Sequence, residues 1–133
     1  MTINGLVVTR NRAMARRGLA SGGGMELDGE TANLTNVVIT YNRAVSYEAF
    51  GGGLEAATSL LTVTGGFVSL NVARGIGEYA EPEGGGMWIG GGATLTNLAI
   101  TFNRAIGDGA TDGGLFADPP ATLNNVVVSA NVP

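Results

Sequence analysis

A tetrapeptide of the form [Val/Ile]-[Thr/Ser]-x-Asn recurs along the whole chain and constrains its fold more than any other feature. The asparagines of its five copies are spaced 31, 29, 32 and 28 residues apart: Asn11, Asn42, Asn71, Asn103 and Asn131. A pair of glycines followed by Met or Leu falls between successive copies, at Gly23-Gly24, Gly52-Gly53, Gly85-Gly86 and Gly113-Gly114. Repetition at a period of about 30 residues predicts one small structural unit per repeat, with the units stacked into a solenoid.

The distances between the two motifs divide each repeat into two parts. From the second glycine to the next motif asparagine the separation is 17 or 18 residues, whereas from each asparagine to the following glycine pair it varies from 11 to 15. A part of constant length is typical of a regular wall, and a part of variable length is typical of a surface loop. We therefore expect a variable loop to leave the wall after each motif asparagine.

Within the constant part, apolar residues alternate with other residues at a period of two, which indicates β-strands. Glycine supplies 23 of the 133 residues, and no stretch has the apolar spacing of a helix. In the first complete repeat the residues predicted to point inward are Met25, Leu27, Ala32, Leu34, Val37 and Ile39. The chain is therefore predicted to be all-β, with residues 1–133 forming a single right-handed parallel β-helix of about four to five turns, each with three short strands.

Stacked parallel strands lie about 4.8 Å apart, so equivalent residues form columns. Amides stacked at that spacing are expected to form an asparagine ladder, hydrogen-bonding to one another and to the backbone of the corner. The alanine two residues later, at Ala13, Ala44, Ala73 and Ala105, is expected to fit a tight inward corner. The glycine pair is expected to supply the positive φ that re-entry from the loop requires.

The composition excludes several kinds of chemistry. The chain has no Cys, His or Lys, which excludes disulfides, the usual zinc ligands, a thiol nucleophile, a histidine base and a Schiff-base lysine. Seven Arg face eleven Asp and Glu, for a net charge of −4, which argues against nucleic acid as a partner. The N-terminus lacks the pattern of a signal peptide, and the sequence contains no run of about 18 apolar residues of the kind that inserts into a membrane. No cofactor is expected.

The combined motifs resemble those of a known group of proteins. The glycine pairs with Met25, Leu54, Met87 and Leu115, together with the five [Val/Ile]xxAsn motifs, are similar to the GGx[ILVM] and [VIF]xxN repeats of right-handed parallel β-helix surface proteins. The likeness is to polymorphic outer-membrane proteins of the autotransporter class and to adhesin-like bacterial proteins. It covers nearly the whole chain. The resemblance implies a stalk or adhesive segment of a longer protein at the bacterial cell surface or outside the cell.

Two columns could contact an anion or a sugar. Arg12, Arg43 and Arg104 directly follow motif asparagines and could bind an acidic polysaccharide, or could pair with loop carboxylates instead. A second column starts with Glu26 and Glu55 and continues with Trp88 and Phe116. Acids at one end and aromatics at the other could form a sugar-binding surface, or the column could be an ordinary half-exposed strand face. The spacing of the acids shows no calcium-binding cluster, and the segment 108–113 resembles a calcium loop only weakly.

The outer face of the third predicted strand is unusually apolar for a surface. One outward column is apolar in all five repeats: Val7, Val38, Phe67, Ala99 and Val127. The outward column beside it carries hydroxyl groups: Thr9, Thr40, Ser69, Thr101 and Ser129. We expect these ten residues to contact either a covering loop, notably residues 72–83, or a second copy of the chain. Hydroxyl columns on flat solenoids also bind ice, although Phe67 interrupts the flatness.

The ends of the sequence predict association as well. The chain starts and stops inside a repeat without a cap, and bare solenoid ends favour contact with further strands. The favoured function is a non-catalytic structural or adhesive β-helix module that associates with itself or with the rest of a longer chain. The alternatives are a carbohydrate-binding or carbohydrate-active β-helix, with polysaccharide as partner, and thirdly an ice-binding or filament-forming solenoid.

Overall fold

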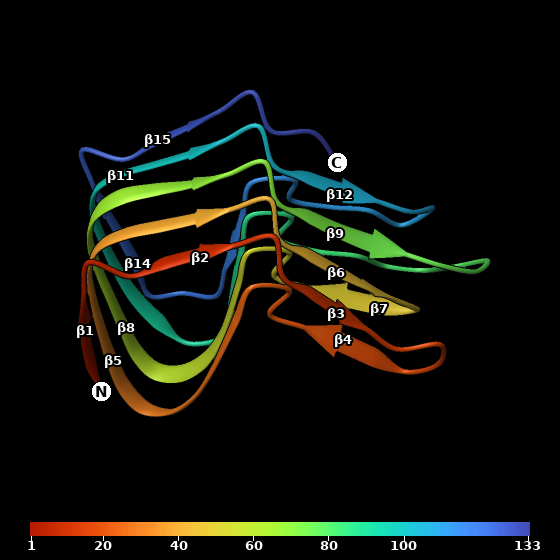
Figure 1. Ribbon diagram of the computed structural model, residues 1–133, viewed down its shortest axis with the longest axis horizontal. Coiled ribbons are helices and arrows are strands. Elements are labelled where there is room, and N and C mark those ends of the chain that lie inside the picture. The colour runs from red at the N-terminus through yellow and green to blue at the C-terminus, as the bar shows by residue number, and fades with distance from the viewer.

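The computed structural model describes the backbone of the chain and the side chains of residues 1–29, 31–58 and 60–133. Across these residues the chain contains strands and turns but no helix, and its parallel strands stack into a β-solenoid of about four turns (Figure 1). The predicted all-β solenoid is therefore confirmed. Successive turns follow one another along the solenoid in chain order, as the colours in Figure 1 show.

The wall of the solenoid consists of the constant part of each repeat. Two complete turns are each a single long, curved strand, β5 (Met25–Thr40) and β8 (Leu54–Ser69). The next turn is divided into β10 (Met87–Ile89) and β11 (Gly92–Thr101), and the last into β13 (Leu115–Ala117), β14 (Ala121–Asn124) and β15 (Val127–Ser129). β1 (Thr2–Asn4) and β2 (Val7–Thr9) pair with β5 from the other side.

The wall is more continuous than the three short strands per turn that the sequence predicts. Pairing between β5 and β8 runs through the expected turn, where Asp28 pairs with Ala57. Stacking on the neighbouring turn supplies hydrogen-bond partners there, so the backbone stays extended. The alternation of side chains therefore continues to Asp28, which lies on the same side of the strand as Glu26.

The core lies inside the wall and consists of the inward-pointing columns. Leu34, Val63 and Leu95 stand in register in successive turns and are at most 1% exposed. The other buried members of this cluster are Leu27, Ala32, Val37, Ile39, Leu54, Ala56, Leu61, Val68, Met87, Ile89, Ala93, Leu98 and Ile100. In the last turn Leu123 and Val128 occupy inward columns but are 48% and 46% exposed, because no further strand of this chain stacks on them.

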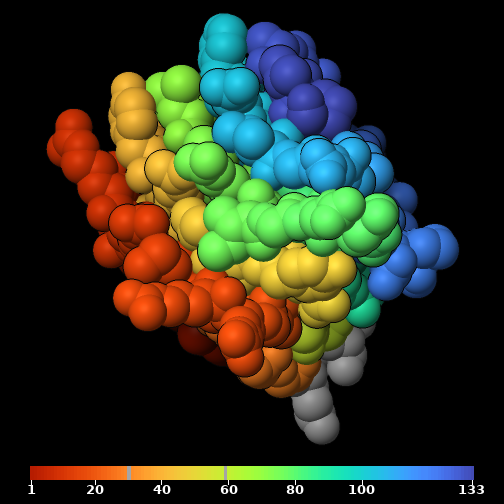
Figure 2. Space-filling view, turned by 90° about the vertical axis from the view of Figure 1, so that its right-hand side faces the viewer, coloured from red at the N-terminus to blue at the C-terminus, as the bar shows by residue number. Residues whose placement is uncertain are grey.

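The variable part of each repeat is more regular than a loop. The segment that follows each of the first four motif asparagines is a strand: β3 (Arg12–Met14), β6 (Arg43–Ser46), β9 (Val72–Gly75) and β12 (Arg104–Ile106). These four strands form a second parallel sheet. In the first two repeats the segment that leads back to the wall is also a strand, and these two strands, β4 (Leu19–Ser21) and β7 (Glu48–Phe50), pair with each other. We call these projections the arms; they all leave one side of the solenoid (Figure 1) and lie stacked in chain order (Figure 2). Ala44, Ala49 and Ala73 form a small second core inside them.

The glycines act differently from the sequence-based expectation. The positive φ belongs to the residue before each pair, at Gly22 (53°), Gly51 (55°), Gly84 (59°) and Asp112 (51°). The pair itself is required by close packing. A Cβ on Gly53 would lie 2.7 Å from the carbonyl oxygen of Gly86 and 2.8 Å from the side chain of Asn71. Only glycine lets the turns approach this closely.

Candidate functional site

The five motif asparagines form a polar column, the asparagine column, along the junction of wall and arms. Its three inner members, Asn42, Asn71 and Asn103, are buried. The amide of Asn71 donates to Asn103 Oδ1 at 3.0 Å and to the carbonyl oxygen of Ile39 at 2.8 Å. Its own Oδ1 accepts from the backbone N–H of Asn42 at 2.9 Å and from the Asn42 amide at 3.1 Å. Equivalent bonds join Asn11 to Asn42 and Asn103 to Asn131. Each of the three inner amides thus bonds both to the next amide and to a backbone carbonyl at the corner.

A second column stands on the outward side of the wall, where the wall meets the arms. Parallel pairing places its four members in register: Glu26, Glu55, Trp88 and Phe116, from β5, β8, β10 and β13. We call this set the corner column. Its chemistry changes from acidic to aromatic along the solenoid, unlike that of the asparagine column.

The acidic end of the corner column gathers three carboxylates. Oxygen atoms of Glu26, Asp28 and Glu55 all lie within 4.8 Å of one another. Glu55 is only 7% exposed, and its Oε2 has no hydrogen-bond partner. Burial, and then the neighbouring Glu26 and Asp28, raise the pKa of Glu55 to about 7 from its usual 4.5.

This cluster differs from the sequence-based expectation that the acids would form no calcium-type group. The spacing of acids along the chain missed it because its members come from two turns. The dipeptide Asp28-Gly29 is typical of a turn, whereas the continuous strand places Asp28 beside Glu26. The cluster is also separate from the segment 108–113, whose sequence weakly resembles a calcium loop. The sequence feature that indicates this cluster is the register of the repeats, which places Asp28 diagonally opposite Glu55 on the neighbouring strand.

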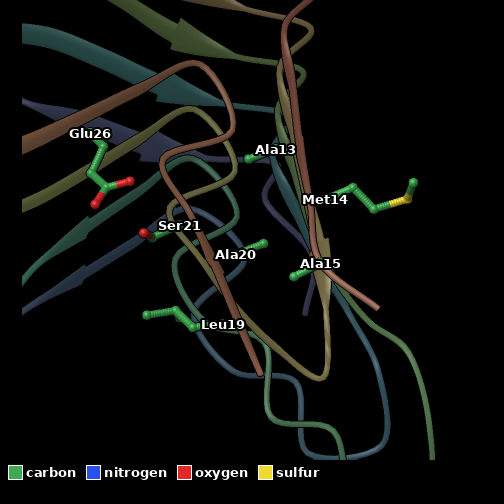
Figure 3. Close-up of a pocket in the computed structure, with 7 residues that line it drawn as sticks. All are labelled: Ala13, Met14, Ala15, Leu19, Ala20, Ser21 and Glu26. Atoms are coloured by element: carbon green, nitrogen blue, oxygen red, sulfur yellow. The ribbon is translucent and has the colours of Figure 1, made fainter. Parts of the chain in front are cut away.

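A hollow of about 370 Å³ opens next to Glu26, between the wall and the first arm. The arm lines it with small or apolar residues of β3 and β4 and the segment between them: Ala13, Met14, Ala15, Leu19, Ala20 and Ser21. Figure 3 shows Glu26 on the wall side of this hollow, facing the arm, while the Met14 side chain points away. Of the three acids of the cluster, Glu26 lines this hollow.

The aromatic end of the corner column is a stack of three rings. Trp88 stacks on Phe116 of the following turn, with ring centroids 5.6 Å apart, and on Phe50 of the preceding arm at 5.3 Å. Its indole Nε1 donates to Glu83 Oε2 at 3.1 Å. Phe50 and Glu83 were not singled out in the sequence, because they lie in variable segments. Since its neighbours occupy the ring faces of Trp88, the stack joins wall to arms and leaves Trp88 little open face for a sugar ring.

The arginines predicted to contact an anion lie on one face of the arm sheet. Arg12 pairs in register with Arg43, and Val72 separates Arg43 from Arg104. The structure adds Arg74, which stands two residues after the repeated arginine position and so does not belong to the sequence column. Burial, then Arg74 and Arg12, lower the pKa of Arg43, whose buried Nε has no hydrogen-bond partner. The charges that act on Arg43 are thus like charges.

The apolar column and its hydroxyl neighbours lie on the outer face of the wall, and we call them the outer strip. Its members are Val7, Val38, Phe67, Ala99 and Val127, with Thr9, Thr40, Ser69, Thr101 and Ser129. Val7, Phe67 and Val127 are 64%, 51% and 53% exposed. Residues 72–83, one of the two alternative contacts predicted for this strip, begin with β9 and extend with the other arms, and Tyr79 in this segment is 72% exposed.

A column of strained residues beside the outer strip was not anticipated. The residue before each motif asparagine has a left-handed backbone: Arg10, Tyr41, Leu70, Phe102 and Ala130, with φ between 54° and 59°. Tyr41, Leu70 and Phe102 are also 55%, 41% and 58% exposed, and the Arg10 guanidinium lies 5.7 Å from the Tyr41 ring centroid. The sequence offered no signal, because this motif position accepts any residue. Tyr41, Leu70 and Phe102 thus add exposed apolar side chains next to the hydroxyl column in sequence.

Comparison with protein-family models, with curated proteins and with solved structures found no match to this chain. In the part of the chain that the structure describes, no helix is long and apolar enough to cross a membrane.

Proposed function

We propose that the chain is a structural, non-catalytic β-solenoid module of a bacterial surface or secreted protein. The observation that carries this proposal is the asparagine column, whose hydrogen bonds continue from Asn11 to Asn131. The glycine pairs, the motif asparagines and the inward apolar columns all contribute to stacking one turn on the next. A chain that devotes its repeated chemistry to stacking is suited to a rigid spacer that holds other surfaces at a distance.

The finer assignment is a right-handed β-helix of the repeat type found in polymorphic outer-membrane and adhesin-like proteins. It rests on the paired glycine and asparagine motifs. The packing supports treating the two motifs as one structural unit, because the glycine pair lies against the motif asparagine. A Cβ on Gly53 would lie 2.8 Å from the side chain of Asn71, and a Cβ on Gly86 would lie 2.8 Å from the side chain of Asn103. This family likeness is also the basis for proposing a position at the cell surface or outside the cell.

The outer strip supports self-association as the adhesive part of this function. Three of its apolar side chains are more than half exposed, and they align along the wall with exposed Tyr41, Leu70 and Phe102 nearby. Continuous apolar surface on a regular wall favours contact with a second wall of the same kind. The proposed partner is therefore another copy of this chain or a neighbouring solenoid.

A panel of neutral and acidic polysaccharides, tested with and without Ca²⁺, examines the non-catalytic part. We expect no product formation above a rate of about 10⁻² s⁻¹, which is far below ordinary enzyme rates. Turnover above that rate would contradict the proposal if it disappears in the double variant Glu26→Gln and Glu55→Gln, which keeps the shape of the corner column but removes its carboxylates.

A second candidate function, binding of an acidic polysaccharide, is favoured by one observation. Arg12, Arg43, Arg74 and Arg104 share one face of the arm sheet, and like charges surround Arg43. Such a face attracts anionic groups. The double variant Arg43→Gln and Arg104→Gln should then abolish retention on an acidic polysaccharide, whereas the matched control Arg16→Gln and Arg17→Gln, in the first arm, should retain it.

A further inference from the structure

The acidic end of the corner column has the composition and size of a cation site. Its three carboxylates offer up to six oxygen atoms, and one oxygen from each residue lies within 4.8 Å of the others. A calcium ion binds oxygen ligands at about 2.3–2.6 Å, so ligands on opposite sides of one ion are about 5 Å apart. The spacing of the three oxygen atoms therefore allows all three to bind one such ion.

A second observation points to a ligand in the same place. Glu55 is more than nine-tenths buried, its carboxylate faces Glu26 and Asp28, and its Oε2 has no hydrogen-bond partner. A buried acceptor without a partner costs free energy, and a buried charge beside two like charges costs more. The charges that act on Glu55 are both negative. A bound cation would satisfy the unpaired oxygen and remove the repulsion.

From this geometry we propose that Glu26, Asp28 and Glu55 bind a divalent cation of the calcium type, beside the recess between the wall and the first arm. The three ligands supply only oxygen atoms, which suit a hard cation. Glu26 and Asp28 are exposed and Glu55 is buried, so the ion enters from solvent and completes its coordination with water. The site joins two successive turns, because Glu26 and Asp28 belong to β5 and Glu55 belongs to β8.

The neighbouring residue of the corner column makes this site directly observable. Trp88 pairs in register with Glu55, one strand further along the solenoid, and it is the only tryptophan of the chain. Adjacent strands are about 4.8 Å apart. Terbium(III) binds oxygen sites of the calcium type and emits when a nearby indole transfers its excitation energy. An ion at this site is therefore expected to give emission that depends on Trp88.

The experiment titrates the metal-free protein with Tb³⁺ under selective excitation of tryptophan, and then displaces Tb³⁺ with Ca²⁺. We expect saturable emission that Ca²⁺ abolishes. Glu55→Gln should raise the Kd for Ca²⁺ measured by calorimetry at least about tenfold, because it removes the buried charged ligand. Asp28→Asn, at an exposed position, should raise it at least about fivefold.

Two further variants provide the controls. Glu48→Gln makes the same chemical change at an exposed position of β7 outside the cluster, and it should leave the Kd within about twofold of the wild-type value. Trp88→Phe should abolish the sensitised emission while calorimetry still detects Ca²⁺ binding, which places the ion beside Trp88. Circular dichroism of each variant verifies that the strands are formed.

Three results would overturn the proposal. The first is a wild-type protein that gives neither sensitised emission nor heat of Ca²⁺ binding. The second is an equal loss of affinity in Glu48→Gln and Asp28→Asn, since binding would then reflect only overall negative charge. The third is unchanged affinity in both folded Glu55→Gln and folded Asp28→Asn. Because the assay measures binding and not turnover, its failure leaves the proposed structural function unaffected.

Discussion

Asn71 and Glu55 are both buried polar residues in columns that run along the solenoid, yet their surroundings are opposite. Asn71 is fully buried, and it donates two side-chain hydrogen bonds and accepts two. Glu55 is 7% exposed, has an oxygen without a partner and faces two further carboxylates. The same stacking therefore satisfies one column and leaves the other unsatisfied.

The difference follows from the chemistry of the two side chains. An amide carries both donors and an acceptor, so identical amides about 4.8 Å apart satisfy one another. An ionised carboxylate only accepts, so Glu26 stacked on Glu55 brings repulsion instead of a bond. Repetition explains the asparagine column by itself, whereas the acidic end of the corner column needs a proton or a cation to be stable.

The largest effect is expected for Asn71→Ala, which interrupts the asparagine column in its middle. The change removes the acceptor of the Asn42 backbone N–H and of one Asn42 amide hydrogen bond, and it removes the donor to Asn103 Oδ1 and to the carbonyl of Ile39. Asn103 Oδ1 keeps the bond from the backbone N–H at position 71, and the Asn42 amide keeps its bond to the carbonyl of Val8. Losing several buried hydrogen bonds at once should lower the free energy of unfolding by roughly 3–5 kcal/mol in urea titrations. Asn11→Ala, at the exposed end of the column, is the matched control and should cost less than about 1 kcal/mol.

The second prediction concerns the pH dependence that Glu55 causes in chelator-treated protein. The pKa of Glu55 is about 7 in the folded chain and near 4.5 when unfolded, so between these values the folded state binds more protons. The contribution of Glu55 to the free energy of unfolding should therefore be most favourable below pH 4.5, and it should be lost as the pH rises through about 7. Glu55→Gln removes this dependence and should be more stable than wild type at pH 8, by on the order of 2 kcal/mol.

Urea titrations of both proteins at pH 5 and pH 8 measure this effect, and the difference between them cancels the titration of other groups. An advantage of Glu55→Gln that is the same at both pH values would contradict a raised pKa. Adding Ca²⁺ should reverse the order at pH 8, because only the wild type retains the complete cation site.

The two columns also differ in how much of each could be predicted from the sequence. Identical residues at a fixed period predict the column of Asn11, Asn42, Asn71, Asn103 and Asn131 and the solenoid that contains it. The acidic cluster could not be predicted fully, because its third member, Asp28, lies where Asp28-Gly29 reads as a turn. Only stacking on Ala57 keeps this segment extended. The arms were missed for the same reason: β3, β6, β9 and β12 are strands because equivalent segments stack, although their own sequences vary.

A smaller effect is expected at the strained position before each motif asparagine. Leu70 has a φ of 58° and is 41% exposed, whereas Asn36, Asn97 and Asn125 hold similar φ values of 53°, 53° and 52° at another corner. Asparagine tolerates this backbone better than leucine does. Leu70→Asn should therefore raise the free energy of unfolding by about 0.5–1 kcal/mol, and Leu70→Val, which is β-branched, should lower it. Equal stability of the three proteins would show that the position carries no strain.

The smallest effect on folding is expected on the outer strip, whose apolar side chains face away from the core. Val38→Asp combined with Val127→Asp should change the free energy of unfolding by no more than about 0.5–1 kcal/mol, because neither residue packs inside the wall. If the outer strip joins two copies, sedimentation at high concentration should show the wild type associated and the double variant monomeric. Thr94→Asp with Thr122→Asp, on the outward side of β11 and β14, is the matched control and should leave association intact. A wild type that stays monomeric at every concentration, or a double variant that associates like the control, would remove the outer strip as an interface between copies.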